Sequence, residues 1–166
     1  RRGPSSTMPR IEIFRFQVHF GDCDPAGIAF YPNFFRWYDA ASRHFFDCCG
    51  LPPWRETEKT HGIIGVPLVE AQSRFIILTN DGEHVEVYTH ISSWEAKVFC
   101  QTHELKRDGE LLAVGEERRV FACRDPQTDL SHCGTCGNAC PMRPSSTPVC
   151  VSGTCSFMCA TAAGAA

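Results

Sequence analysis

One carboxylate of the sequence lies where an apolar segment gives way to a sharp turn. Asp24 is followed by Pro25, which fixes one backbone dihedral, and by Gly27, which permits conformations that other residues avoid. A segment with helical periodicity begins a few residues later, and the first turn of a helix carries N–H groups without intrahelical partners. A carboxylate beside such groups combines a nucleophile or general base with donors for a developing oxyanion. Such a pair of groups could act on a carbonyl carbon.

Other interpretations of this segment stay open at the level of sequence. Asp24 could instead cap the turn with its side chain, as aspartate often does, and Asp22 is expected to be a turn or ion-pair residue. Cys23 invites a nucleophile, but no partner histidine can be identified for it. The histidines show no ligand spacing with one another, so we expect no metal site and no cofactor.

Apolar periodicity predicts the elements that must position Asp24. Residues 11–20 alternate between apolar and polar side chains, which predicts a strand. In residues 33–49 the apolar side chains recur every three or four positions, which predicts a long helix with Asn33 as its N-cap and Gly50 just past its end. A short helical turn and a short strand are then expected within 56–61 and 62–69, and four longer strands at 71–78, 84–93, 97–106 and 111–122.

Two turn signals between these strands set the predicted fold class. Asn80-Asp81-Gly82 and Arg107-Asp108-Gly109 are typical of hairpin turns. One long central helix and an antiparallel meander give an α+β fold, in which a curved sheet of about five strands wraps around the helix. A single long helix leaves one face of such a sheet uncovered, so we expect the chain to form oligomers.

Composition argues against several classes of protein. The 166 residues carry a formal net charge of −3, which gives no reason to expect a nucleic-acid partner. No run of about 18 apolar residues occurs, so we expect no membrane span. Residues 1–8 lack the apolar core of a signal peptide. We therefore expect a cytoplasmic protein whose first nine residues form a disordered extension.

The cysteines divide the chain into two regions. Five of the eleven are scattered through the first 125 residues, and the other six follow the spacing C-x2-C-x3-C-x9-C-x4-C-x3-C between residues 133 and 159. We place a main domain at 10–125 and a cysteine-rich tail at 126–166. Disulfides are favoured over zinc for the tail because the C-x2-C pair occurs there once. A third interpretation is that the tail is not native to this protein, since disulfides conflict with a reduced compartment.

Several motifs of the first half of the chain carry a resemblance to a known family. They are Phe20-Gly21-Asp22-Cys23-Asp24-Pro25-Ala26-Gly27-Ile28, Tyr31-Pro32-Asn33, Arg36-Trp37, Asp39-Ala40-Ala41-Ser42-Arg43 and Cys49-Gly50-Leu51-Pro52-Pro53-Trp54-Arg55. Together they closely resemble the 4-hydroxybenzoyl-CoA thioesterase family of hotdog-fold acyl-CoA thioesterases. The resemblance runs from about residue 12 to residue 122 and is densest in its first third.

The resemblance implies a hotdog fold, dimers with a continuous sheet, a homotetramer built from dimers, and an active site at the dimer interface. By position, Asp24 corresponds to the catalytic carboxylate. Tyr31 corresponds to the residue whose backbone N–H polarises the thioester carbonyl. Asp39 corresponds to a helix acid near the aromatic end of the substrate, and Trp94 and Lys97 to residues that contact the CoA.

Asp39 and Arg119, which corresponds to a family arginine in the last strand, have simpler interpretations, and the chain also departs from the family pattern. Asp39 could merely face solvent or pair with Arg43 one helical turn away, and Arg119 is expected at the surface. Two basic residues that would bind CoA phosphates are Glu95 and Ala96 here. A family threonine is Val66, and the family's C-terminal tail is replaced by the cysteine segment.

The sequence as a whole predicts a thioester hydrolase. The expected substrate is an aromatic acyl-CoA such as 4-hydroxybenzoyl-CoA, and the products are the free acid and CoA. An aspartate suffices as nucleophile or general base, because a thiolate leaves readily. Two alternatives are a broad-range aliphatic acyl-CoA thioesterase and a non-catalytic, cysteine-rich interaction protein.

Overall fold

The computed structural model describes residues 9–123, 141, 146–152 and 154–159. The chain divides into two compact units, one comprising residues 1–51 and 67–120 and the other residues 52–66 and 121–166. The first unit contains the long helix and the main sheet, and with them every residue that the sequence predicts for the site.

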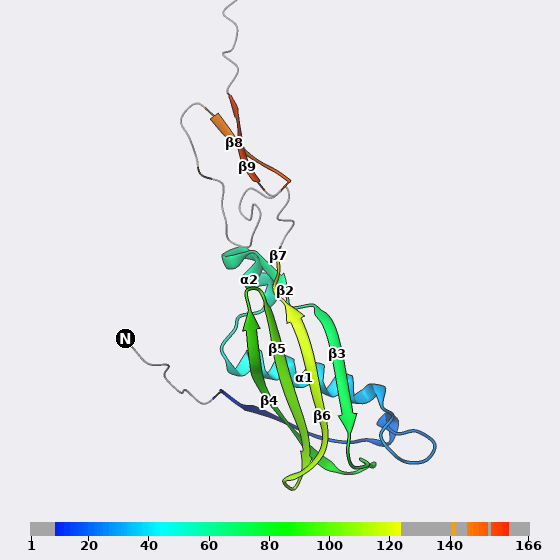
Figure 1. Ribbon diagram of the computed structural model, residues 1–166. Coiled ribbons are helices and arrows are strands. Elements are labelled where there is room, and N and C mark those ends of the chain that lie inside the picture. Colours follow the sequence, from blue (N-terminus) through cyan, green and yellow to red (C-terminus); the bar gives the residue numbers. More distant parts are fainter. Residues whose placement is uncertain (1–8, 124–140, 142–145, 153, 160–166) are drawn as a thin grey trace, which may run out of the picture. The chain divides into compact units, whose positions relative to one another are not determined.

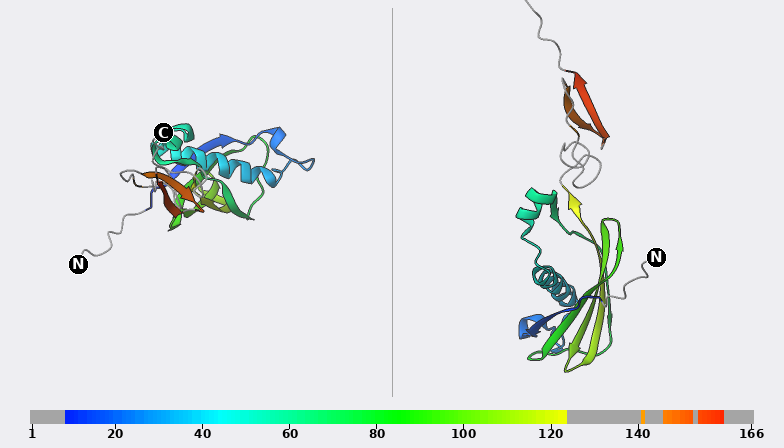
Figure 2. Two further views of the ribbon diagram at one scale, coloured as in Figure 1. Left: turned by 90° about the horizontal axis from the view of Figure 1, so that it is seen from above. Right: turned by 90° about the vertical axis from the view of Figure 1, so that its left-hand side faces the viewer.

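The first unit is a five-stranded antiparallel sheet with one long helix on one face, which confirms the predicted α+β hotdog class (Figures 1 and 2). The strands follow the order β1-β4-β5-β6-β3. Buried side chains alternate along the strands, as at Val85, Val87 and Thr89, so that one face of the sheet is turned to the core. The bounds are β1 (Glu12–Gln17), β3 (Leu68–Phe75), β4 (His84–Glu95), β5 (Val98–Arg107) and β6 (Glu110–Val120).

One of the two predicted hairpin turns is present and the other is not. Asp108 and Gly109 join β5 to β6, and both have positive φ, at 49° and 85°, as a tight hairpin requires. The prediction of a hairpin at residues 80–82 was wrong, because β3 pairs with β6 and β4 lies between β1 and β5. The Gly82 N–H donates instead to the Val18 carbonyl, which extends the pairing of β1 with β4.

The long helix α1 (Pro32–Cys48) begins one residue before the predicted start. Tyr31 is its N-cap, so the prediction of Asn33 as N-cap was wrong. Asn33 is buried in the first turn, and its side-chain amide donates to the Asp22 carbonyl at 2.8 Å. The proline at the first helical position explains the shift, since its fixed φ suits a helix start and its missing N–H is not needed there. Gly50 follows the helix end, as predicted.

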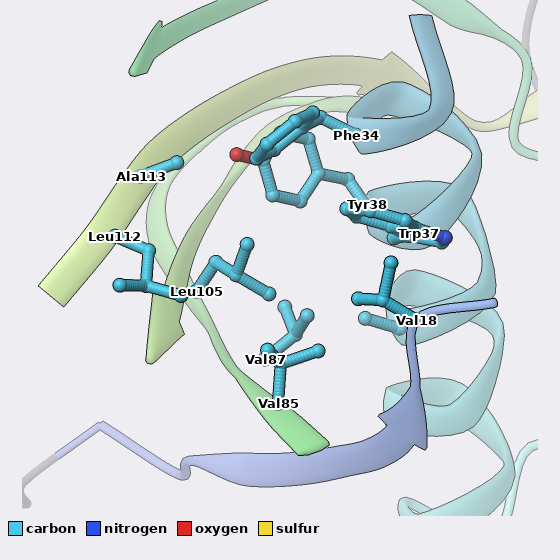
Figure 3. Close-up of a cluster of buried hydrophobic side chains, with 10 residues drawn as sticks. Val18, Phe34, Trp37, Tyr38, Val85, Val87, Leu105, Leu112 and Ala113 are labelled. Atoms are coloured by element: carbon cyan, nitrogen blue, oxygen red, sulfur yellow. The ribbon is translucent and has the colours of Figure 1, made fainter. Parts of the chain in front are cut away.

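The core of this unit lies between α1 and the concave face of the sheet (Figure 3). Phe34, Trp37 and Tyr38 project from the helix toward valines and leucines of the strands, and each is at least 90% buried. The ring of Tyr38 stacks on His103 of β5, with 5.1 Å between centroids, and its hydroxyl lies 3.0 Å from the Ser73 hydroxyl. Burial raises the pKa of Tyr38 to about 12. The helix is therefore attached to the sheet by packed aromatic rings.

Gly115 of β6 makes room for the Tyr38 ring, and this predicts a loss of stability on substitution. A Cβ at residue 115 would lie 2.7 Å from both Cδ2 and Cζ of Tyr38, closer than real Cβ atoms approach. We expect Gly115→Ala to lower the free energy of unfolding by about 1–3 kcal/mol, as overpacked cores do. Urea denaturation measures the change. Gly21→Ala is the matched control, since nothing lies within 4 Å of that position. Equal stability of the Gly115 variant and wild type would contradict the packing described.

The second unit contains short elements. They are α2 (Trp54–His61), β2 (Ile63–Gly65), β7 (Ala122–Cys123), β8 (Ser146–Val151) and β9 (Thr154–Cys159). The helical turn and short strand predicted near 56–61 and 62–69 correspond to α2 and β2. Strand β2 pairs with β7, and β8 pairs with β9 so that Cys150 is opposite Cys155. No helix among the described residues is long and apolar enough to cross a bilayer.

The cysteines differ between the two units. Cys23, Cys48, Cys49 and Cys100 of the first unit are free thiols. In the second unit Cys123, Cys150 and Cys155 are disulfide-bonded, which agrees with the prediction of disulfides for two of the tail cysteines. The predictions for Cys133, Cys136 and Cys140, and for the extension at 1–8, fall outside the described residues.

Candidate active site

The loop before α1 is a closed turn with Asp24 at its first position. The Asp24 N–H donates to the Ile28 carbonyl at 2.8 Å, and the Gly27 N–H donates to the Asp24 carbonyl at 2.9 Å. Pro25 occupies the second turn position, where its fixed φ is favoured, and Gly27 has a φ of 80°, which favours glycine. The Pro/Gly pair thus closes the loop and holds Asp24 beside the helix that follows.

The Asp24 carboxylate is oriented by this turn. Its Oδ1 accepts a hydrogen bond from the Ala26 N–H at 2.8 Å, and the side chain is half-buried. The carboxylate therefore caps the turn through one oxygen only. Its Oδ2 makes no hydrogen bond with another residue that the structure describes. One carboxylate can serve both roles here. The hydrogen bond between the Ala26 N–H and Oδ1 caps the turn, and it also fixes the direction in which Oδ2 points.

Backbone pairing attaches the loop to the sheet and to α1. The Ala29 N–H donates to the Thr79 carbonyl at 2.7 Å, shortly before β4 begins, and the Phe30 N–H donates to the Asp22 carbonyl at 2.8 Å. The Asn33 side chain donates to the same Asp22 carbonyl. Three hydrogen bonds thus fix the path of the chain from the carboxylate to the first turn of the helix.

The N-terminus of α1 presents one backbone amide. Pro32 has no N–H, and the N–H groups of Asn33 and Phe34 donate to the carbonyls of Phe30 and Tyr31. The Tyr31 N–H, in contrast, donates to no residue within the described part of the chain. The helix dipole favours negative charge at this end. The Tyr31 N–H is therefore placed to donate a hydrogen bond to an anionic oxygen from outside the chain.

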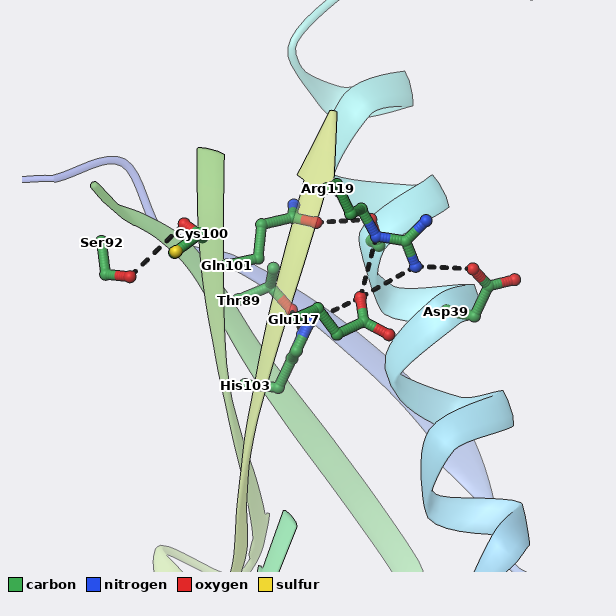
Figure 4. Close-up of polar contacts among 9 residues, drawn as sticks. Asp39, Thr89, Ser92, Cys100, Gln101, His103, Glu117 and Arg119 are labelled. Atoms are coloured by element: carbon green, nitrogen blue, oxygen red, sulfur yellow. Dashed lines mark hydrogen bonds and ion pairs between the residues drawn. The ribbon is translucent and has the colours of Figure 1, made fainter. Parts of the chain in front are cut away.

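Asp39 lies two helical turns further along α1 and belongs to a network that reaches the middle of the sheet (Figure 4). Its Oδ1 accepts a hydrogen bond from Arg119 Nη2 of β6 at 2.7 Å. Nε and Nη2 of Arg119 also donate to Glu117 Oε2, at 3.0 and 2.8 Å. The same Glu117 oxygen lies 3.2 Å from His103 Nε2, and His103 Nδ1 lies 2.9 Å from the Thr89 hydroxyl.

This network excludes one interpretation of Asp39 and overturns the prediction for Arg119. Asp39 does not pair with Arg43, which contacts Asp47 instead. Arg119 is only 6% exposed and is no surface residue. Sequence reasoning missed it because charged residues occupy both faces of β6 at this end. The available signal was the alternation that places Glu117 and Arg119 on the same face as Ala113, which is completely buried.

Trp94 and Lys97 lie at the far end of the sheet from the Asp24 loop. Trp94 is exposed near the end of β4 and packs against Phe99, whereas Lys97 is in the turn before β5 and not in the predicted strand. The Asp24 loop pairs with residues just before β4 begins. The length of β4 separates the two ends by about 30 Å. Within one chain, Asp24 and Tyr31 therefore lie on the same hydrogen-bonded loop, whereas Trp94 and Lys97 are far from it.

Cys23 is poorly suited to be a nucleophile. Burial, followed by nearby carboxylates, raises the pKa of its thiol, so the thiolate is disfavoured. Its sulfur lies 3.8 Å from the His19 carbonyl, and among the described residues no histidine ring is hydrogen-bonded to it. Among the described residues, no three His, Cys, Asp or Glu side chains are grouped as a metal ion would require.

Comparisons with known proteins identify the family of this chain. The family model described as the thioesterase-like superfamily matches residues 18–147. A 4-hydroxybenzoyl-CoA thioesterase from Pseudomonas sp. (strain CBS-3) is 42% identical over 123 residues, which are 71% of this chain and 87% of that protein.

Solved structures give the same result. A mutant 4-hydroxybenzoyl CoA thioesterase complexed with 4-hydroxybenzoyl CoA superposes with a TM-score of 0.66 at 41% identity, covering 70% of this chain and 86% of that one. A gentisyl-coenzyme A thioesterase superposes with a TM-score of 0.61 at 38% identity, covering 68% and 90%.

Proposed function

Since this chain belongs to the thioesterase-like superfamily, we propose that it hydrolyses an aromatic acyl-CoA, of the 4-hydroxybenzoyl-CoA kind, to the free acid and CoA. The enzyme is a thioester hydrolase. One observation carries the proposal, namely that a turn-fixed carboxylate at Asp24 leads directly to a helix whose first amide, at Tyr31, is unbonded within the described chain. These are the two groups that thioester cleavage needs.

In the proposed reaction, Asp24 acts as nucleophile or as general base for water at the thioester carbon. The Tyr31 N–H stabilises the oxyanion, and one such donor typically contributes about 3 kcal/mol to catalysis. The CoA thiolate leaves and takes up a proton, and water supplies the oxygen and hydrogen of the free acid. Asp39 lies near the acyl ring, and Trp94 and Lys97 contact the CoA. No metal or redox step is required.

The active site is proposed to be assembled from two copies of the chain, in a homotetramer built from dimers. Strand β3 is at the edge of the sheet and exposes apolar side chains, among them Leu68, Val69 and Phe75. Such an edge offers unpaired backbone groups to a second copy. The separation of Trp94 and Lys97 from the Asp24 loop supports the same arrangement, because a neighbouring copy can bring these residues to that loop.

A cytoplasmic location is also part of the proposal. Four free thiols in the first unit, Cys23, Cys48, Cys49 and Cys100, are typical of proteins from a reduced compartment. The disulfide-bonded cysteines belong to the second unit.

Release of CoA from three substrates tests the proposed function. We expect turnover of 4-hydroxybenzoyl-CoA and benzoyl-CoA, with kcat/KM at least about tenfold above that for octanoyl-CoA, because a pocket shaped for a ring discriminates by about 1–3 kcal/mol. Free thiol appearing with time is the measured quantity. Preference for octanoyl-CoA would favour the aliphatic alternative. No turnover of any of the three by folded enzyme would refute the proposal.

A further inference from the structure

The ion pair of Asp39 is unusual because its two members differ in burial. The side chain of Asp39 is 72% exposed, whereas that of Arg119 is 7% exposed. An exposed aspartate on a helix surface normally samples several rotamers, and an exposed ion pair contributes little to stability. Here the Arg119 guanidinium is buried, so it does not follow the rotamers of the exposed Asp39 carboxylate. The position of the Asp39 carboxylate is thus determined by a group that belongs to the sheet.

Arg119 is held in place by buried groups on the side away from Asp39. Glu117 is 1% exposed and balances the arginine charge through two hydrogen bonds to a single oxygen. Burial alone would raise the pKa of Glu117, but its contacts with His103 and Arg119 outweigh burial, and the pKa is lowered. Glu117 is therefore ionised at neutral pH, and the guanidinium is fixed by charge and by geometry.

His103 in turn holds the Glu117 carboxylate in place. It is fully buried, stacked on Tyr38 and bonded on both ring nitrogens. Its Nε2 lies 3.2 Å from Glu117 Oε2, and its Nδ1 lies 2.9 Å from the Thr89 hydroxyl. The order Thr89, His103, Glu117, Arg119, Asp39 therefore runs from three adjacent strands to the surface of α1 (Figure 4).

We propose that Arg119 is a positioning residue for substrate recognition, which acts by holding Asp39 with its free oxygen directed away from the sheet. Arg119 occupies Oδ1, so that Oδ2 is left to accept a hydrogen bond from a donor on the acyl ring. The ligand class is an acyl-CoA whose ring carries a hydroxyl group. This inference rests on the proposed function and adds the residue that fixes the orientation of Asp39.

A double-mutant cycle on two substrates tests the inference. The variants are Asp39→Asn, Arg119→Lys and the double variant, and kcat/KM is measured with 4-hydroxybenzoyl-CoA and benzoyl-CoA. Lysine keeps the charge opposite Glu117 but cannot bridge two carboxylates as a guanidinium does. We expect Arg119→Lys to reduce kcat/KM for the hydroxylated substrate about tenfold, mainly through KM, and for benzoyl-CoA less than about twofold. In the Asp39→Asn background it should cause no further loss.

Controls separate this role from a merely structural one. Arg15→Met removes an arginine of β1 with an equally short ion pair, to Glu86, and should change neither substrate. If Arg119→Lys does not fold, the neutral pair Arg119→Gln with Glu117→Gln takes its place in the cycle. Equal losses on both substrates, or additive losses with Asp39→Asn, would overturn the inference while the proposed function stands. No turnover of either substrate by wild type would overturn both.

Discussion

Replacing Asp24 with asparagine is expected to lower kcat by about three orders of magnitude, since loss of a general base or nucleophile costs on the order of 10²–10⁴ in rate. Asparagine is the most informative replacement because its side-chain oxygen can still accept the Ala26 N–H and preserve the turn. What it loses is the charge and basicity of the other oxygen. The measurement is CoA release from the preferred aromatic substrate at saturation.

Two comparisons make this result interpretable. The melting temperature of Asp24→Asn should equal that of wild type, because the turn and its backbone bonds are retained. Asp22→Asn is the matched control, since Asp22 Oδ2 accepts the His19 N–H at 3.0 Å and asparagine can do the same. We expect that variant to retain activity within about twofold, because asparagine keeps the bond to His19 and so leaves the loop around Asp24 in place. Turnover indifferent to Asp24→Asn would refute the assigned role.

The second large effect is expected for the buried carboxylate of β6. Glu117→Gln should lower the free energy of unfolding at pH 7 by about 3–5 kcal/mol, because it leaves the buried Arg119 without its main counter-charge. The pKa of Glu117 is lowered from an ordinary value of 4.5, so folding favours the ionised form. That stabilisation is complete above the unfolded pKa and is lost as the pH falls through the folded one.

The pH dependence gives this prediction its test. Urea titrations of wild type and Glu117→Gln should differ most near pH 7 and converge progressively as the pH falls below about 4.5. Glu104→Gln is the control, because Glu104 is 40% exposed and pairs with Lys106 at the surface. Its effect should stay below about 1 kcal/mol. A constant difference between wild type and Glu117→Gln over the whole pH range would show that the lost stability does not come from the ionised carboxylate.

The fold and the catalytic loop could be predicted because their signals are local. Alternation identified the strands, the three-and-four spacing identified α1, and Asp108-Gly109 identified the β5–β6 turn. The helix start was missed by one residue because a proline at the first helical position and an asparagine at the next both favour helix N-termini. The hairpin at 80–82 was wrong for a different reason. Turn residues indicate that the chain reverses, but not which strand lies beside β4 in the sheet.

The support of Asp39 could not be predicted because it depends on which face of a strand is buried. Residues 116–119 of β6 are all charged, so either face could have been turned to solvent. The outcome is decided by partners on other strands, namely His103 and Gln101 of β5, which face the same side and are fully buried. Only the assembled sheet shows that Glu117 and Arg119 lie on the inner face.

The different burial of Asp39 and Arg119 also affects how such an enzyme can evolve. Substitution of Asp39 leaves Arg119 paired with Glu117, so no buried charge loses its balance and the chain stays above its stability threshold. Substitution of Arg119 or Glu117 removes that balance. Residue 39 can therefore vary among descendants of this sequence while residues 117 and 119 are retained. Substrate preference can thus diverge by single exchanges on the outer surface of α1, with the sheet beneath unchanged.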